Sequence, residues 1–141
     1  MQVMKLANSV DEELALRGDL DANRIRSVEI DALVDTGATM LVLPEDVVEK
    51  LGLRVLGYRN VRYADGRRTS LPWVGGVKIT ILDRETIVTA LVEGRGTTPL
   101  IGQIPLEELD LLVDPKSPKS RELRVNPASP DAPLLDILRA A

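Results

Sequence analysis

The sequence predicts a mostly antiparallel β fold with one or two short helices. Only 2% of the 141 residues are aromatic although 44% are hydrophobic, so the core must be aliphatic. β-Branched aliphatic side chains favour strands. Several short runs alternate between apolar and polar residues, and turn-forming residues separate these runs. The length allows one domain with a modest core.

The first quarter of the chain is expected to hold two strands joined by a loop. Residues 3–8 are expected to form a short strand. Residues 9–23 are rich in Asp, Asn and Gly, which predicts a loop or a short hairpin. From residue 24 the apolar positions alternate with polar ones, and Ala32-Leu33-Val34 is continuously apolar, as in a strand that enters the core.

A helix and a hairpin are expected next. The helix covers 44–51, because Pro44 suits its first position and Gly52 suits a left-handed stop. The hairpin covers 61–70 and turns at Asp65-Gly66, a strong two-residue turn signal. Strand-like runs follow at 74–82 and 86–92.

The C-terminal third divides into the end of the body and an arm. A turn is expected at 94–96, a short helix from Pro105 over 106–109 and a last strand at 111–113. The domain prediction is therefore a body at 1–114 and an arm at 115–141. Five of the nine prolines lie between 115 and 133, which indicates an extended arm. Within the arm, we expect an edge strand at 121–126 and a short helix at 134–141.

Composition excludes several kinds of chemistry. The chain has no Cys and no His, which rules out disulfides, thiolate nucleophiles, Ser–His catalysis and the usual zinc sites. Any catalysis is therefore expected to use carboxylates, without a metal or cofactor. The net charge of −4 and the lack of a long basic block argue against nucleic acid and membrane partners. No apolar run suggests a signal peptide or a membrane span, so we expect a cytoplasmic protein.

One short motif carries chemical information. Asp35-Thr36-Gly37-Ala38-Thr39 follows the apolar run 32–34 and precedes a second apolar run, Leu41-Val42-Leu43. A carboxylate at the end of a buried strand is held in place, and Gly37 permits a tight turn in which backbone amides approach that carboxylate. Farther along the chain, Leu100-Ile101-Gly102 consists of two apolar residues and a glycine, and it also leads into a predicted helix.

These residues resemble the retropepsin-like aspartic peptidases, the single-lobe relatives of pepsin, and in particular small bacterial members. The resemblance covers about residues 24–126. It implies a closed barrel of the acid-protease type, with Asp35, Thr36 and Gly37 as the catalytic loop and the Thr36 hydroxyl bonding across a twofold axis. It further implies that substrate contacts come from the loop and from the hairpin, which would act as a flap; these residues are Ala38, Thr39, Ala64, Asp65 and Gly66.

A single carboxylate does not complete this chemistry. The aspartic mechanism needs two carboxylates that share a proton, one acting as a base on water and the other donating to the substrate carbonyl. No second Asp-Thr-Gly or Asp-Ser-Gly is present. We therefore expect a homodimeric endopeptidase with Asp35 of each subunit on the twofold axis.

Other interpretations stay open at this point. Asp35 could simply close a strand, and Asp65-Gly66 could be an ordinary hairpin turn. Leu100-Ile101-Gly102 is explained by core packing alone, and Trp73 suits either a core or a pocket. At the level of function, the alternatives are a non-catalytic binding or dimerisation module with this fold, and an assembly domain held together by the arm.

Overall fold

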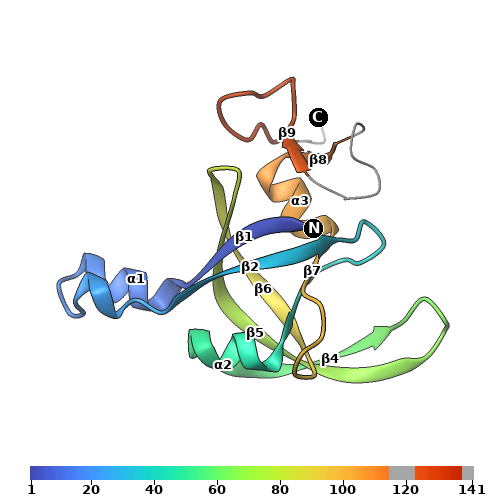
Figure 1. Cartoon of the computed structure of the whole chain (residues 1–141), viewed down its shortest axis with the longest axis horizontal. Coiled ribbons are helices and arrows are strands. Elements are labelled where there is room, and N and C mark those ends of the chain that lie inside the picture. Colours follow the sequence, from blue (N-terminus) through green and yellow to red (C-terminus); the bar gives the residue numbers. More distant parts are fainter. Residues whose placement is uncertain (115–122, 138–141) are drawn as a thin grey trace.

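The computed structural model describes residues 1–114 and 123–137. This part of the chain is mostly β, with the short α-helices α1 (Ser9–Leu16), α2 (Glu45–Leu51) and α3 (Gln103–Leu109) and the 3-10 helix η1 (Ala22–Arg24) (Figure 1). The expected β-rich class is confirmed, and α1 is a helix that the sequence did not predict. No helix in the described ranges is long and apolar enough to cross a membrane.

Seven strands form the main sheet, in the order β1-β2-β7-β3-β6-β5-β4. Their bounds are β1 Gln2–Asn8, β2 Ser27–Val34, β3 Leu41–Pro44, β4 Val55–Arg62, β5 Arg68–Ile81, β6 Arg84–Glu93 and β7 Leu100–Ile101. Strand β1 also pairs with β5, so the pairings of six strands run in a ring that returns to β1, and β4 extends the sheet beyond β5. Most pairs are antiparallel, whereas β2–β7 and β3–β6 are parallel.

The core is aliphatic, as the composition predicts. Fully buried side chains come from most strands of the sheet, from α2 and from α3; the largest are Met4, Leu6, Leu41, Leu43, Leu51, Ile79, Ile81, Ile101 and Leu109. Helix α2 ends as expected at Gly52, which has the left-handed φ of 62°. Pro44 precedes the helix as the last residue of β3 rather than being its first helical residue.

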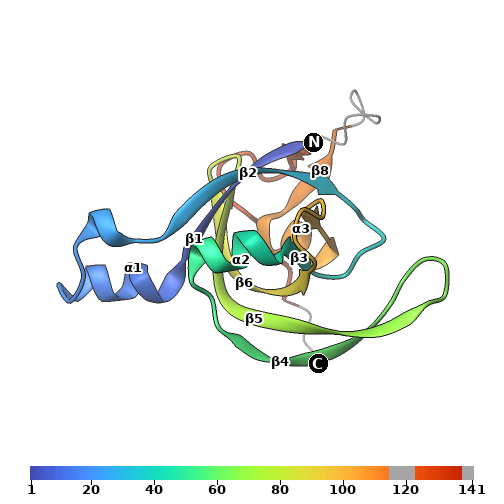
Figure 2. The ribbon, with the colours of Figure 1, turned by 60° about the horizontal axis from the view of Figure 1, so that its bottom comes forward.

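The hairpin is longer than predicted. Strand β4 begins at Val55, and β5 runs without interruption from Arg68 to Ile81, so the separate strand expected at 74–82 is the inner part of β5. The ladder shifts register between Val74 and Val77, where Gly76 has a φ of 69°. Such a bulge bends a strand without ending it, which explains why the sequence suggested two strands. In Figures 1 and 2 the hairpin projects from the body, with its tip on the same side as the loop after β2.

The prediction of a loop or hairpin over 9–23 is wrong, because α1 forms there. Asn8 caps this helix: its Oδ1 accepts hydrogen bonds from the N–H groups of Val10 (3.0 Å) and Asp11 (3.1 Å). The acidic residues Asp11 and Glu12 lie in the first turn, where the helix dipole favours negative charge. The same Asp and Asn residues that suggested a loop therefore begin a helix.

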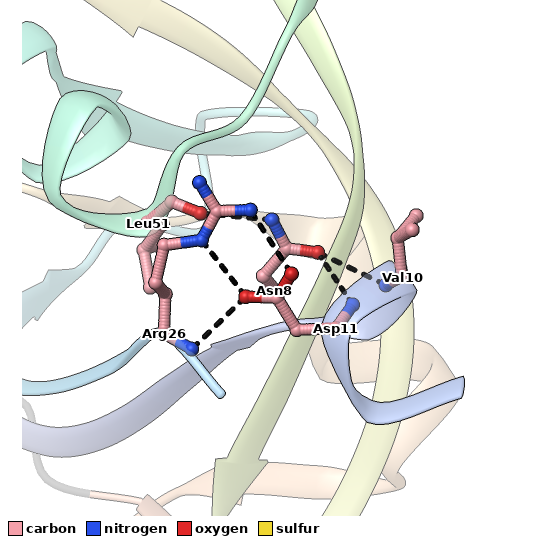
Figure 3. Close-up of polar contacts among 5 residues, drawn as sticks. All are labelled: Asn8, Val10, Asp11, Arg26 and Leu51. Atoms are coloured by element: carbon pink, nitrogen blue, oxygen red, sulfur yellow. Dashed lines mark hydrogen bonds and ion pairs between the residues drawn. The ribbon is translucent and has the colours of Figure 1, made fainter. Parts of the chain in front are cut away.

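A polar cluster ties α1 to the sheet and to α2 (Figure 3). The buried Asp11 carboxylate accepts from Nε (2.8 Å) and Nη2 (2.9 Å) of Arg26 and from its backbone N–H (3.0 Å). The Asn8 amide donates to the Leu51 carbonyl at the end of α2 (2.9 Å). A Cβ at Gly52 would lie 1.8 Å from Nη1 of Arg26, so this glycine also makes room for the guanidinium.

The described part of the arm packs against its own body. Strand β9 (Leu123–Val125) pairs with β8 (Leu111–Val113), within the edge strand predicted at 121–126, and Leu123 is buried. Buried Arg84 donates to the carbonyls of Leu109, Asp110 and Ser129. The Asp110 carboxylate accepts from Ser129, Asn126 and the Leu134 N–H, and these bonds, that from Ser129 above all, lower its pKa.

The helix expected at 134–141 is absent from its described portion, since residues 134–137 have no regular structure. Residues 138–141, 115–120 and the start of the predicted edge strand lie outside the described residues. In the single chain, Leu134, Leu135 and Ile137 are between 59% and 76% exposed. No neighbouring helix or strand of the described chain covers them, which removes the amphipathic environment that a short helix needs.

Candidate active site

The sheet places Asp35 at the end of a buried strand. Val34, the last residue of β2, is buried and lies beside Ile101 of β7 in parallel register. The Asp35 backbone N–H donates to the Ile101 carbonyl (3.0 Å), and the Leu33 N–H donates to the Pro99 carbonyl (2.9 Å). The backbone at Asp35 is therefore fixed by the core of the sheet, while its side chain is half-buried at the surface.

The turn after Asp35 is tight and bonds to its carboxylate. The Gly37 N–H donates to Oδ1 of Asp35 (3.0 Å), and the Ala38 N–H donates to the Asp35 carbonyl (3.1 Å). A Cβ at Gly37 would lie 3.2 Å from the same Oδ1, a tight contact. A glycine at this position lets the amide approach the carboxylate, as the sequence predicted.

The apolar-apolar-glycine element, Leu100-Ile101-Gly102, packs against this loop. A Cβ at Gly102 would lie 2.4 Å from the Met40 carbonyl oxygen and 2.8 Å from that of Ala38. The first N–H groups of α3 complete the contact: Gln103 donates to Ala38 (2.8 Å) and Ile104 to Thr39 (2.9 Å). Residues 35–40 therefore rest on the backbone of 102–104, and only a glycine leaves the necessary space at position 102.

The hairpin tip carries the other residues that the sequence singled out. Ala64, Asp65 and Gly66 are exposed, and Gly66 has a φ of 88°. Asp65 accepts from the backbone N–H (3.0 Å) and Nε (2.7 Å) of Arg67. Among the described residues, no hydrogen bond joins Ala64, Asp65 or Gly66 to the Asp35 loop, so the structure brings together 35–40 and 100–104 but leaves the tip apart.

Two contacts that the sequence did not reveal connect the hairpin to the body. Nη1 of Arg59 donates to Sδ of Met40 (3.3 Å), and the Arg59 guanidinium lies 4.5 Å from the centre of the Trp73 ring. The Tyr63 hydroxyl donates to Oε1 of Glu93 at the end of β6 (2.8 Å). This bond to the carboxylate, together with burial, raises the pKa of Tyr63. No alternating pattern along β4 signals either contact.

Carboxylate chemistry is what this arrangement offers. The described residues contain no group of three Asp, Glu, His or Cys side chains that could hold a metal ion. Asp35 is half-buried in the loop after β2, and the hairpin projects on the same side of the molecule as this loop (Figure 2). A β-rich body that presents one Asp-Thr-Gly carboxylate in this way has the features of the retropepsin-like aspartyl protease class.

Comparison with known families gives the same class. The model of the family described as "gag-polyprotein putative aspartyl protease" matches residues 22–108, more than half of the chain, and the chain belongs to this family. The match includes the Asp35 loop, the hairpin and Gly102, whereas α1 and the arm lie outside it. A comparison with curated proteins gives no match.

Proposed function

We propose that the protein is an aspartic endopeptidase that hydrolyses peptide bonds with two Asp35 carboxylates, one from each subunit of a homodimer. The observation that carries this proposal is the fixed position of Asp35, whose backbone N–H bonds to Ile101 and whose carboxylate accepts from Gly37. Membership of the aspartyl protease family supports the reaction class.

The second carboxylate is the reason for the dimer. Two carboxylates across a twofold axis repel each other when both are ionised, so they retain one proton between them. The ionised member then takes a proton from the attacking water, and the protonated member donates to the substrate carbonyl. Thr36 is exposed in the single chain, which is compatible with a hydroxyl that bonds to the partner loop.

The remaining parts of the site follow from this arrangement. Ala38 and Thr39 would border the cleaved bond, and Ala64, Asp65 and Gly66 would cover the substrate when the hairpin acts as a flap. A flap excludes water from the reaction once the peptide is bound. Six strands pair in a ring, in the order β1-β2-β7-β3-β6-β5 and back to β1. This ring supports a closed barrel of the acid-protease type as the rigid body beneath the flap.

The domain organisation and assembly are part of the same proposal. Residues 1–114 would form the peptidase body and 115–141 an arm that takes part in dimerisation. Strands β8 and β9 form a separate two-stranded sheet whose outer edges have no further strand among the described residues, which supports sheet extension by a second copy. The cytoplasmic location stays a prediction that cell fractionation can test.

Peptide cleavage by wild-type protein and by Asp35→Asn tests the reaction. We expect cleavage by the wild type, inhibition by a pepstatin-type inhibitor and no cleavage by Asp35→Asn. Binding of peptides by both proteins without cleavage by either would favour a non-catalytic binding module.

Mixed dimers test the shared site. If each site needs two Asp35 residues, an equal mixture of wild-type and Asp35→Asn chains, unfolded and refolded together, should retain about one quarter of the activity of the same total amount of wild type. A site contained within one chain would instead retain about one half. An equal mixture that is not refolded, and whose subunits have not exchanged, is the control and should retain one half in both cases.

A further inference from the structure

The hairpin differs in charge from the rest of the molecule. Residues 54–70 contain five arginines and one aspartate, a net charge of +4, whereas the whole chain carries −4 and the remainder therefore carries −8. The single aspartate, Asp65, is already bound to Arg67. A positively charged segment attracts negatively charged partners, and its charge favours them over neutral ones.

Arg59 is the arginine of this segment that faces the catalytic loop. Its Nη1 contacts Sδ of Met40, five residues after Asp35, and Met40 is held in place because its backbone packs on Gly102. The guanidinium lies over the Trp73 ring, and a planar cation stacked on an aromatic ring is oriented before any ligand arrives. Tyr63, four residues farther along the chain and just after β4, also contacts the body, so this is the inner face of the hairpin.

The guanidinium N–H groups of Arg59 have only a weak hydrogen-bond acceptor among the described residues. A thioether sulfur is a weak acceptor, and no carboxylate in the described ranges bonds to Arg59. Guanidinium groups bind carboxylates with two parallel, charge-assisted hydrogen bonds, which are much stronger than a bond to sulfur. An acidic side chain that enters between the hairpin and the loop could therefore replace Met40 as the acceptor.

The outer part of the hairpin is also positively charged, because it carries Arg62 and Arg68. A hollow of about 610 Å³ is lined by Asn60, Val61, Arg62, Arg68, Thr69 and Ser70. Arg62 and Arg68 are partners in the β4–β5 register, and like charges directly opposite each other destabilise a strand pair. No ion pair in the described chain includes either of them, so a negatively charged peptide beside the hairpin would reduce their repulsion.

We propose that Arg59 is a specificity-determining residue that binds an acidic side chain of the peptide substrate through its guanidinium group. This inference rests on the proposed peptidase function for its biological meaning, and it names the substrate class: extended peptides with Asp or Glu near the cleaved bond. The binding site itself is a property of this chain that can be measured without catalysis.

Binding is tested with the Asp35→Asn protein, which prevents cleavage during the titration. The probes are two capped octapeptide libraries, identical except that one has a fixed glutamate where the other has a fixed glutamine. Calorimetry measures affinity, and fluorescence of Trp73, the only tryptophan, reports contact beside Arg59. We expect about tenfold tighter binding of the glutamate library at low salt, and a smaller ratio at high salt.

Two variants test whether Arg59 causes the preference for glutamate over glutamine. Arg59→Gln should reduce the glutamate-to-glutamine ratio to about one. Arg54→Gln removes the same unit of charge from a residue that neither lines the hollow nor stacks on Trp73, and it should leave the ratio within about twofold of its starting value. Equal loss in both variants would mean that only net charge matters and would overturn the assignment of Arg59.

Cleavage profiling separates this inference from the proposed function. Mass spectrometry of a digested peptide library should show Asp and Glu enriched at one fixed distance from the bonds that the wild type cleaves, and Arg59→Gln should lose this enrichment. Cleavage with no acidic preference, together with equal binding of both libraries, overturns the role of Arg59 and leaves the peptidase intact. Acid-selective binding through Arg59 without any cleavage supports the binding site and overturns the peptidase.

Discussion

Single glycines determine where the backbone of the active-site loop can pass. Gly37 lets its own N–H reach Oδ1 of Asp35, and Gly102 lets the carbonyl groups of Ala38 and Met40 pack against β7 and α3. Neither glycine has a positive φ, so the requirement comes from space and not from backbone strain. The position of Asp35 therefore depends on a residue 67 positions away in the sequence.

Replacing Gly102 should displace the loop. A Cβ at this position meets backbone atoms at 2.4–2.8 Å, and backbone cannot move aside as a flexible side chain can. We expect Gly102→Ala to destabilise the fold by about 1–3 kcal/mol in denaturant unfolding and to reduce peptide cleavage strongly. Gly94→Ala is the matched control, because a Cβ there has no neighbour within 4 Å. Equal stability of the two variants would contradict this account of the loop.

At the scale of elements, polar contacts hold the two segments that project from the body. Helix α1 buries only Asp11, and this carboxylate is bound by Arg26. The hairpin is linked to β6 through Tyr63 and Glu93 and to the active-site loop through Arg59. Segments held by a few polar contacts open more easily than core strands, which suits a flap but makes α1 sensitive to pH.

The attachment of α1 should weaken in acid. The hydrogen bonds from Arg26 lower the pKa of Asp11 in the folded protein, so its stabilising effect is present above the unfolded-state pKa and is lost as pH falls through the folded-state pKa. We expect Asp11→Asn to lower the melting temperature at pH 7, with a difference from wild type that shrinks toward pH 3. Exposed Asp19, changed to Asn, is the control, and a pH-independent difference would refute the mechanism.

The contact between Tyr63 and Glu93 should restrain the hairpin. A hydrogen bond to a carboxylate is worth roughly 1.5–3 kcal/mol, less when it is partly exposed. We expect Tyr63→Phe to raise amide hydrogen exchange at the hairpin tip about five- to tenfold while exchange in the core strands stays unchanged. Tyr58→Phe makes the same chemical change at a side chain that is 69% exposed. If both variants exchange like wild type, the bond does not restrain the hairpin.

At the scale of the whole molecule, two features of the single chain bear on the proposed dimer. The chain contains one Asp-Thr-Gly carboxylate, and the apolar side chains of Leu134, Leu135 and Ile137 in the described part of the arm are exposed. The network of Arg84 and Asp110 holds the preceding segment on its own subunit. The exposed end of the arm is therefore positioned by its own body but is free to contact a partner.

Charges placed on this end should weaken dimerisation. Apolar side chains that become buried in an interface contribute about 1.5–3 kcal/mol each when burial is complete. We expect Leu135→Asp combined with Ile137→Asp to raise the dimer dissociation constant at least about tenfold in analytical ultracentrifugation. Leu16→Asp, on α1, changes a residue that is 85% exposed and should have no effect. An unchanged constant in the double variant would show that the end of the arm has no part in assembly.

The sequence by itself indicated the protein family and much of the β structure. The Asp-Thr-Gly triplet after an apolar run, together with the lack of His and Cys, pointed to carboxylate chemistry, because these features depend on residue type alone. Helix α2 was predictable for a similar reason: its acidic first turn, its apolar face and Gly52 are all local signals. Strands β8 and β9 were likewise visible as short apolar or alternating runs.

Only the tertiary structure decided what depends on long-range contacts. The helix at residues 9–16 is held on the body by Arg26, which lies just before β2, 15 residues after Asp11, and binds the Asp11 carboxylate. The predicted hairpin became one long bent strand pair because β5 stays paired with β6 and β1 beyond its bulge. Only folding brings Arg59 into contact with Trp73 and Met40, since no local pattern tells which arginine faces the Asp35 loop.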